Sequence, residues 1–408
     1  MLSSRGTVTA PAPIPLCSVP ADDGCPFVAL PQPFASIPRL EWERLHALTP
    51  AATPFSRWTF HRAWWDGYGG SAHEQYLAVV ARDDPERLRG IVPLMHRHEV
   101  EATDSLTAST LRHGPGAPLT GVPPTAKAVF FAASYHADYA TVLSAPDDLP
   151  GVARALVATL AGPPEPSHGS EPWEIVDLRR LRADDSAADA LEAAFRAVVD
   201  DAGWCLLRER EDVCPTVELP VGADWDGFLA ALGKKERHEV RRKLRRAEAA
   251  GEVRLAFVAD PAAAVDGFIA LHQARWGADG LFPDSEGGRR SRRFLESLAA
   301  LEGPGGALEI GFVTVGGRRV AAVAGFDDGT TISYYNAGAD PAARDLSPGV
   351  LAVSLYLQAA LARGRRAFDF LRGQEPYKYE WGARDVPVDR LLVWRTVGQG
   401  PDGGGDGR

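Results

Sequence analysis

Few cysteines, no long apolar run and no excess of positive charge limit what this 408-residue chain can be. The four cysteines, Cys17, Cys25, Cys205 and Cys214, are scattered without a CxxC or Cys/His cluster, which predicts reduced thiols and no disulfide framework. No run approaches the roughly 20 apolar residues of a membrane-spanning helix. Prolines interrupt the apolar N-terminus, which makes it a poor signal peptide. The net charge of −10 argues against a general nucleic-acid binder. We therefore expect a cytoplasmic protein.

Composition divides the chain into two ordered halves between flexible ends. Residues 1–35 are rich in Pro, Ala and Ser, and residues 398–408 are rich in Gly, so both are expected to be flexible. The span between them is long enough for two domains, which we place at residues 36–222 and 223–397. Helices and strands alternate in both, and each half has a β-hairpin followed by another strand and a helix. This order favours an α/β fold of the layered-sandwich (α+β) type over a doubly wound parallel sheet.

Periodicity locates the elements. In the second half, Trp225, Phe228, Leu229 and Leu232 lie at i, i+3, i+4 and i+7, which predicts a helix with Asp224 as its N-cap. Helices are expected at residues 55–68, 262–276, 291–301 and 347–362. Strands are expected at residues 76–80, 88–94, 140–143, 173–178, 205–208, 217–219, 253–258, 307–315, 319–326, 331–337, 367–371 and 389–393.

The turn at residues 344–349 is the best-marked candidate for a ligand site. Pro348 suits the first turn of the following helix because it has no N–H to leave unsatisfied, and Ser347 is a suitable N-cap. The N–H groups of such a turn, with the helix dipole behind them, bind anions. Gly349 allows close approach of a ligand, and Arg344 can pair with a phosphate. The plain alternative is a well-capped helix with no ligand.

A second candidate is the loop that follows the strand predicted at residues 367–371. Residues 372–382 combine aromatic and ionisable side chains and are too polar for a core. Loops at strand ends are where binding and catalytic groups concentrate.

These two segments resemble known acyltransferases. Arg344-x-x-Ser347-x-Gly349 resembles the R/Q-x-x-G-x-G/A signature of the GNAT superfamily, with serine in place of the first glycine. FDFLRGQEPYKYEWG, at residues 368–382, resembles the DFLRG…YK…W signature of its CelD-like, BioF-like acetyltransferase family. PFSRWTFHRAWWDGYG (54–69) and GIVPL (90–94) are similar to the opening motifs of that family. The resemblance extends over residues 54–395.

The resemblance implies two tandem GNAT-like acyltransferase domains, laid out as in the Fem-type peptidyltransferases, and an acyl thioester donor. Acyl-CoA, acetyl-CoA by preference, would be a co-substrate, and no tightly bound cofactor is expected. No metal site is expected either. The donor-binding residues it implies are Arg344, Leu346, Ser347, Gly349 and Val350.

Direct acyl transfer needs a base that takes the proton of the acceptor and an acid that gives a proton to the departing thiolate. We expect Asp369 or Glu375 as the base, with Asp369 favoured because burial in a strand would raise its pKa. Tyr377 is the candidate acid, and Lys378 the candidate orienting charge for an anionic acceptor. A structural ion pair between Asp369 and Lys378 is the alternative. The residues expected to bind the acceptor are Tyr335, Asn336, Arg372, Trp381, Lys234 and Arg241.

Residues 234–246 carry eight Lys or Arg against two Glu, which contrasts with the acidic chain as a whole. Val240, Leu244 and Ala247 form an apolar stripe, so the segment is expected to be a helix docked by one face. It is either a solvated helix or a site for an anionic partner: a phosphate- or uronate-bearing acceptor, a carrier-bound donor, or tRNA.

Three functions remain open from the sequence. The first is a CoA-dependent N- or O-acyltransferase that acts on a small-molecule or sugar acceptor. The second is a Fem-like aminoacyl or peptidyl transferase with a tRNA- or carrier-bound donor, for which the acidic net charge is unfavourable. The third is a non-catalytic GNAT pair that serves as a module in polysaccharide biosynthesis. The acceptor and the oligomeric state cannot be deduced from these residues.

Overall fold

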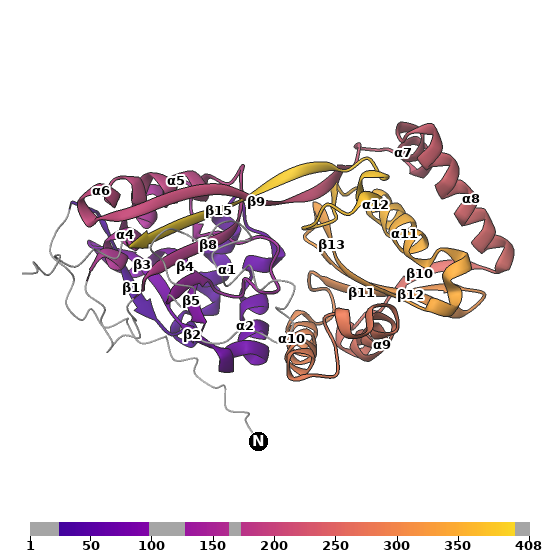
Figure 1. Cartoon of the computed structure of the whole chain (residues 1–408), viewed down its shortest axis with the longest axis horizontal. Helices are drawn as coiled ribbons and strands as arrows, with labels where there is room; N and C mark the ends of the chain where they lie inside the picture. The colour runs from indigo at the N-terminus through magenta and orange to yellow at the C-terminus, as the bar shows by residue number, and fades with distance from the viewer. Residues whose placement is uncertain (1–23, 98–126, 163–172, 396–408) are drawn as a thin grey trace, which may run out of the picture.

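The computed structural model describes residues 24–97, 127–162 and 173–395, and it has two lobes joined by a pair of long strands (Figure 1). The connecting strands are β9 (Trp204–Glu218) and β15 (Arg384–Arg395), which pair antiparallel. Both lobes combine sheets with covering helices, so the expected mixed α/β layered fold is confirmed.

The N-terminal lobe is built on two sheets. A four-stranded sheet has the order β1-β3-β4-β7, and the strands β9-β15-β8-β6-β5-β2 form one end of a larger sheet of eleven. The strands are β1 (Phe27–Gln32), β2 (Ala72–Glu74), β3 (Tyr76–Ala81), β4 (Asp84–Val92), β5 (Leu94–Arg97), β6 (Ala128–Phe131), β7 (Leu143–Ser144) and β8 (Ile175–Arg182). The helices are α1 (Arg39–Leu48), α2 (Trp58–Tyr68), α4 (Leu149–Ala161), α5 (Ser186–Arg196) and α6 (Val199–Ala202).

Strand β3 is buried on both faces because two different cores cover it. Ala78 and Val80 belong to an aromatic-rich core that includes residues of α1 and α2. Leu77 and Val79, which point to the opposite face, belong to a core that includes residues of α4 and α5. The continuous apolar run of this strand follows from that position.

The C-terminal lobe is built on a meander of antiparallel strands in the order β10-β11-β12-β13, and β14 then joins parallel to β13. The strands are β10 (Val253–Phe257), β11 (Leu308–Val315), β12 (Arg318–Asp327), β13 (Thr331–Ala339) and β14 (Ala367–Asp369). The helices are α7 (Trp225–Ala231), α8 (Lys234–Ala250), α9 (Val265–Trp276), α10 (Glu286–Glu302), α11 (Pro348–Ala362) and α12 (Pro376–Tyr379). Asp224 caps α7 as expected, since its carboxylate accepts from the N–H of Gly227 at 2.8 Å.

Alternation along β12 sorts its side chains between two layers. Ala321 and Val323 pack in the core that contains α11, while Ala322 and Ala324 pack in the core that contains α9 and α10. Helix α11 is apolar almost all round because it lies between this sheet and α8. The sheet thus presents one face to α11 and the other to α9 and α10, with the end of β13 between them.

The two lobes share strands and a helix contact. Residues 205–208 and 217–219, expected to be two strands, belong to the single 15-residue strand β9. Strand β15 pairs with β8 as well as β9, so the C-terminal strand of the chain completes the sheet of the N-terminal lobe. The boundary expected at residues 222–223 stays a prediction, and this shared strand shows that the lobes are not two separate stretches of chain.

Helices α2 and α10 bring the lobes into direct contact below the strands (Figure 1). The rings of Phe60 and Phe294 meet edge to face at 5.3 Å. A Cβ at Gly67 would lie 2.9 Å from the carbonyl oxygen of Arg290, so glycine is needed for the helices to approach this closely. The lobes are therefore packed against each other at fixed positions.

Two expectations about the first half need correction. Residues 27–32, placed in a flexible arm, form strand β1 because their backbone pairs with β3. The strand expected at residues 140–143 is only Leu143–Ser144. Residue Phe34 of the same arm is also ordered, since it is buried in the 3-10 helix Phe34–Ser36. Residues 1–23 of the arm and the tail at 398–408 lie outside the described residues. Among the helices that are described, none is both long and apolar enough to cross a membrane.

Candidate functional site

The candidate site is an opening between β13 and β14. The two strands pair only from Thr331–Ser333 to Ala367–Asp369, whereas β13 continues to Ala339. The segment that follows β14 turns away at Leu371, whose backbone is left-handed with φ of 59°. Parallel strands that separate in this way expose an unpaired strand edge at the centre of the lobe.

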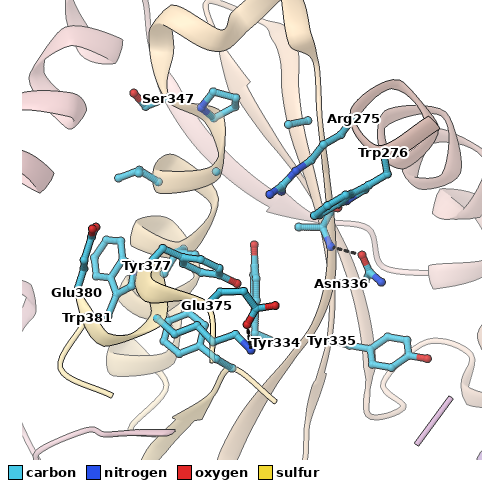
Figure 2. A pocket seen from close by; sticks show the side chains of 18 of the residues that line it. Arg275, Trp276, Tyr334, Tyr335, Asn336, Ser347, Glu375, Tyr377, Glu380 and Trp381 are labelled. Carbon is cyan, nitrogen blue, oxygen red and sulfur yellow. Dashed lines mark hydrogen bonds and ion pairs between the residues drawn. The ribbon is translucent and has the colours of Figure 1, made fainter. Parts of the chain in front are cut away.

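A cavity of about 740 Å³ fills this opening (Figure 2). Strand β13, the N-terminus of α11, the loop after β14 and the end of α9 supply most of its wall. Eleven of the fifteen site residues expected from the sequence line it: Tyr335, Asn336, Arg344, Ser347, Gly349, Val350, Arg372, Glu375, Tyr377, Lys378 and Trp381. Asp369, Leu346, Lys234 and Arg241 do not.

The turn before α11 forms one end of the cavity. Ser347 has φ of 56° and ψ of 55°, the left-handed conformation that glycine adopts most readily. Ser347 is the N-cap residue of α11, as expected, but its side chain makes no capping hydrogen bond. The serine stands where the GNAT signature has its first glycine, and its backbone adopts a conformation that a glycine there would favour.

Gly349 provides an open surface at this turn. A Cβ built on it meets nothing within 4 Å, so the space beside its backbone is empty cavity. Val350 donates its N–H to the carbonyl of Ser347 at 2.9 Å, whereas the Gly349 N–H has no hydrogen-bond partner in the described part of the chain. A free N–H at a helix N-terminus, next to open space, is suited to bind an anion.

Three cations line the cavity without an ion pair among the residues described. They are Arg344 in the turn, Lys243 on α8 and Arg275 at the end of α9. Arg275 lies over the ring of Trp276, with 4.5 Å between the guanidinium carbon and the ring centroid, and Figure 2 shows both side chains extending from α9 towards the cavity. Leu346, expected to contact the donor, instead packs against the α11 core. The turn at residues 344–349 thus shares the cavity with three cations that form no ion pair with the described residues.

Glu375 and Lys378 lie in the wall opposite the turn. The Lys378 ammonium is 2.9 Å from Oε2 of Glu375 and also donates to the carbonyls of Leu371, Arg372 and Gly373. Lys378 is 3% exposed, so its ammonium interacts with these protein groups and not with solvent. Glu375 is 56% exposed, and its Oε1 has no hydrogen-bond partner among the described residues. The carboxylate is therefore held by one oxygen and presents the other to the cavity.

Tyr377 is next to this carboxylate. Burial of its hydroxyl, followed by the nearby charge of Glu375, raises the pKa of Tyr377 to about 12. Its ring packs edge to face against Phe370, with 5.9 Å between centroids. Tyr377 is thus protonated at neutral pH and able to donate a hydrogen bond.

Asp369, the favoured base from the sequence, lies outside the cavity lining. Its carboxylate accepts from the Tyr139 hydroxyl and from the Leu371 N–H, each at 2.7 Å. Burial raises the pKa of Asp369 to about 6, as expected, although its two hydrogen bonds oppose the rise. The alternative of an Asp369–Lys378 ion pair is wrong, because Lys378 pairs with Glu375.

The acceptor residues expected from the sequence divide into two groups. Tyr335, Asn336, Arg372 and Trp381 line the cavity, while Lys234 and Arg241 are exposed on α8, where Arg241 pairs with Asp226 at 3.0 Å. On the open edge of β13, Asn336 Oδ1 accepts from the N–H of Ala337 at 2.8 Å (Figure 2). No group of three His, Cys, Asp or Glu within the described residues is placed to hold a metal ion.

Some lining residues were not found from the sequence. Asp138 of the N-terminal lobe reaches the cavity and accepts from Arg372 at 3.2 Å. Arg275 and Trp276 end a helix that was expected, but periodicity does not show which way a helix end points. Lys243 and Glu380 also line the cavity and were not named from the sequence. The sequence did contain a signal for each: Lys243 lies in the basic segment on α8, and Glu380 lies in the polar loop at 372–382.

Comparison with known proteins shows what this part of the chain is similar to. A family model described as an acetyltransferase (GNAT) domain matches residues 234–379, which include the donor turn, β13 and Glu375. No curated protein sequence matches the chain.

Solved structures extend the likeness to both lobes. FemX is 11% identical, with a TM-score of 0.55, and the match covers 86% of this chain and 96% of FemX. A conserved protein of unknown function from Bacteroides thetaiotaomicron VPI-5482 is 10% identical, with a TM-score of 0.52 and coverage of 88% and 98%. A tandem GNAT protein from the clavulanic acid biosynthesis pathway, solved without AcCoA, is 11% identical with a TM-score of 0.43. At these identities the first two establish the fold alone.

Most of the residues that line the cavity, including the turn at 344–349 and Glu375, lie inside the matched segment, while the two-lobed architecture extends beyond it. Residues 234–379 therefore match the model of a GNAT acetyltransferase domain, and the two-lobed α/β fold is similar to that of FemX.

Proposed function

We propose that the chain transfers an acyl group, acetyl by preference, from acyl-CoA to an amine or hydroxyl of a small-molecule or sugar acceptor. The observation that supports this most is that one cavity contains both the turn at Ser347–Gly349, with its free N–H at Gly349, and the carboxylate of Glu375, which is held by Lys378. Acyl-CoA as donor would place the reaction in the cytoplasm. A role in polysaccharide biosynthesis, implied by the resemblance to CelD-like proteins, belongs to the same proposal.

The donor would bind with its phosphates at the turn. The Gly349 N–H and the N-terminal dipole of α11 suit a pyrophosphate, and Arg344, Lys243 and Arg275 supply three positive charges beside it. The acyl thioester would extend along the open edge of β13. The left-handed Ser347 supports this assignment, since it preserves the turn where the signature glycine is missing.

The chemistry follows from the residues at the other wall. The acceptor nitrogen or oxygen attacks the thioester carbonyl carbon, its proton passes to Oε1 of Glu375, and the C–S bond breaks with its electron pair on sulfur. Tyr377 donates a hydrogen bond to that sulfur. Because the pKa of Tyr377 is about 12 and that of a thiol is about 8.5, Tyr377 stabilises the thiolate without fully giving up its proton.

A second candidate is an aminoacyl or peptidyl transfer of the Fem kind, with a tRNA- or carrier-bound donor. The fold likeness to FemX and the row of cations on α8 favour it. Lys378 does not contribute to binding an anionic acceptor in either proposal, because three carbonyls and Glu375 already surround its ammonium.

Acetyl-CoA provides the test. A ligand at one hundred times its Kd stabilises a protein by about 2.7 kcal/mol, so acetyl-CoA should raise the melting temperature while ADP leaves it nearly unchanged. Release of free CoA thiol should then be measured against a panel of amines, amino acids and amino sugars. Stabilisation by tRNA alone would favour the second candidate. Stabilisation without thiol release from any acceptor would favour a non-catalytic binding module.

A further inference from the structure

Helix α8 carries more positive charge than the donor cavity uses. Lys234, His238, Arg241 and Arg245 lie at i, i+4, i+7 and i+11, so they share one face, and all four are exposed. The adjacent face carries Lys235, Arg242 and Arg246. Figure 1 shows the helix along the outer edge of the C-terminal lobe, next to α11. A basic surface about 18 Å long, from Lys234 to Arg246 at 1.5 Å per residue, therefore faces away from the protein.

Most of this charge is not neutralised by the protein. Arg241 pairs with Asp226 and Arg242 with Glu239, but these are exposed contacts of the kind that contribute little. Lys234, Lys235 and Arg245 form no ion pair with any residue that the structure describes. In a chain of net charge −10, this concentration of available cations indicates a local site for an anionic surface.

The basic surface is continuous with the mouth of the cavity. Lys243 of α8 lines the cavity beside Arg344, and Arg246 donates to the carbonyl of Asp345 in the donor turn at 2.8 Å. Lys234 is nine residues from Lys243, or about 14 Å along the helix axis. A partner that contacts the whole helix is thus larger than a ligand held at the turn. Such a partner could carry that ligand into the cavity through the mouth beside Lys243.

The composition of α8 distinguishes between polyanions. Its sequence has no Phe, Tyr or Trp, so the unpaired bases of an RNA end would have only His238 and the arginine guanidinium planes on which to stack. Glu236, Glu239 and Glu248 interrupt the basic rows, which disfavours a continuous phosphate backbone. Its apolar stripe, Val240, Leu244 and Ala247, is buried in the lobe and therefore not available to enter a lipid surface. An acidic protein surface with discrete carboxylates fits this pattern better than either.

We propose that α8 docks an acidic carrier protein that presents its acyl group on a phosphopantetheine arm. The inference rests on the proposed acyl transfer and names the donor. A phosphopantetheine thioester is the same chemical group as the acyl end of acyl-CoA, so it enters the same cavity, with its phosphate at the Ser347–Gly349 turn. The acceptor nitrogen bonds to the acyl carbon, the C–S bond breaks, and the carrier leaves as the free thiol with the proton released from the nitrogen.

The test compares two donors on one charge-reversal variant. Lys235→Glu/Arg245→Glu changes two exposed residues outside the cavity, and Arg87→Glu/Arg154→Glu makes the same change in net charge on exposed residues of the N-terminal lobe. The probes are acetyl-CoA and an acetyl-loaded bacterial acyl carrier protein, titrated against the full chain by calorimetry. We expect the α8 variant to weaken carrier binding by roughly tenfold or more. Acetyl-CoA affinity should stay within about twofold, because the reversed charges lie outside the cavity.

Each outcome is decisive. Carrier binding that falls in the α8 variant but not in the control, and that falls with added salt in the wild type, supports the proposal. Equal carrier binding by all three proteins, or acetyl-CoA binding without carrier binding, overturns it and leaves the proposed acyl transfer standing. Binding of neither donor contradicts the proposed function itself. Binding of tRNA, lost in the α8 variant while the carrier is not bound, overturns the carrier proposal in favour of a nucleic-acid donor.

Discussion

Lys378 and Glu375 form an ion pair of 2.9 Å in which the two partners have different surroundings. The lysine is buried and also donates to three backbone carbonyls of the loop after β14. The glutamate is half exposed and keeps one oxygen towards the cavity. One buried charge thus fixes the loop and aims the carboxylate, so stability and chemistry should respond to different substitutions.

Glu375→Gln should remove turnover without unfolding the protein. The amide keeps the shape of the side chain but does not accept the acceptor's proton, and loss of a general base costs about 10²- to 10⁴-fold in rate. We expect kcat to fall in this range in an assay of thiol release from acetyl-CoA, with the thermal shift by acetyl-CoA retained.

Asp369→Asn is the matched control in that assay. Asp369 lies outside the cavity lining and its carboxylate is hydrogen-bonded to Tyr139 and Leu371. Turnover should therefore stay within a few fold of the wild type. If Asp369→Asn lost activity and Glu375→Gln kept it, the assignment of the base would be reversed.

Lys378→Met should act on stability first. It leaves the carbonyls of Leu371, Arg372 and Gly373 without their shared donor, and an unsatisfied buried polar group costs about 1–3 kcal/mol. We expect the free energy of unfolding in urea to fall by about 2–4 kcal/mol. Lys243→Met, on a helix at the cavity mouth, should change it by less than about 0.5 kcal/mol. Equal effects of the two substitutions would argue against the bridging role of Lys378.

Gly349→Val should block the donor while leaving the fold intact. The position beside Gly349 is open, so the added side chain meets no protein atom and points into the space assigned to the phosphates. The melting temperature of the free protein should be nearly unchanged, and the thermal shift by acetyl-CoA should be lost. Gly349 has ordinary helical backbone, so valine causes no backbone strain there. The same change at Gly329, where φ is 91°, would be strained and is not a suitable control. Retained acetyl-CoA binding by Gly349→Val would move the donor elsewhere.

Ser347→Gly should preserve donor binding and leave stability within about 1 kcal/mol of the wild type. Glycine relieves the left-handed strain of roughly 1 kcal/mol but loses a similar amount through the greater freedom of the unfolded chain. Ser347→Val should destabilise, since a β-branched residue is disfavoured at φ of 56°. Calorimetric melting of the three proteins measures this order.

The sequence was sufficient for features encoded locally. The capped start of α7, the strand β12 and the apolar helix α11 follow from patterns within a few residues. What it did not reveal depends on contacts between distant segments. The two short strands at 205–208 and 217–219 are one strand because β15, nearly two hundred residues later, pairs along its length.

The same distinction explains the site. The residues of the turn and the polar loop were found because their chemistry is concentrated in short segments. Asp138 reaches the cavity through its contact with Arg372 of the other lobe. Asp369 lies outside the cavity because of the face of β14 that it occupies. The preference for Asp369 rested on its burial, which the structure has, but burial placed the carboxylate next to Tyr139 and not in the cavity.

Asp369→Asn should make stability less dependent on pH. The folded protein holds the pKa of Asp369 at about 6, mainly through burial, whereas an unfolded aspartate has a pKa of about 3.9. Below both values the carboxyl is protonated in either state and contributes nothing. As pH rises from about 4 to 6, the unfolded state ionises first, so the wild type loses stability that the asparagine variant keeps.

We compare the free energy of unfolding of the variant with that of the wild type at each pH. Between pH 4 and pH 7 this difference should shift in favour of the variant by up to about 3 kcal/mol. Asparagine also weakens the bonds to Tyr139 and Leu371, but that loss does not change with pH in this range and cancels in the comparison. Urea unfolding of both proteins at pH 4, 5, 6 and 7 measures it. A difference that is flat with pH would show that Asp369 ionises in the folded protein as readily as in the unfolded chain, and that its burial is offset by the two hydrogen bonds.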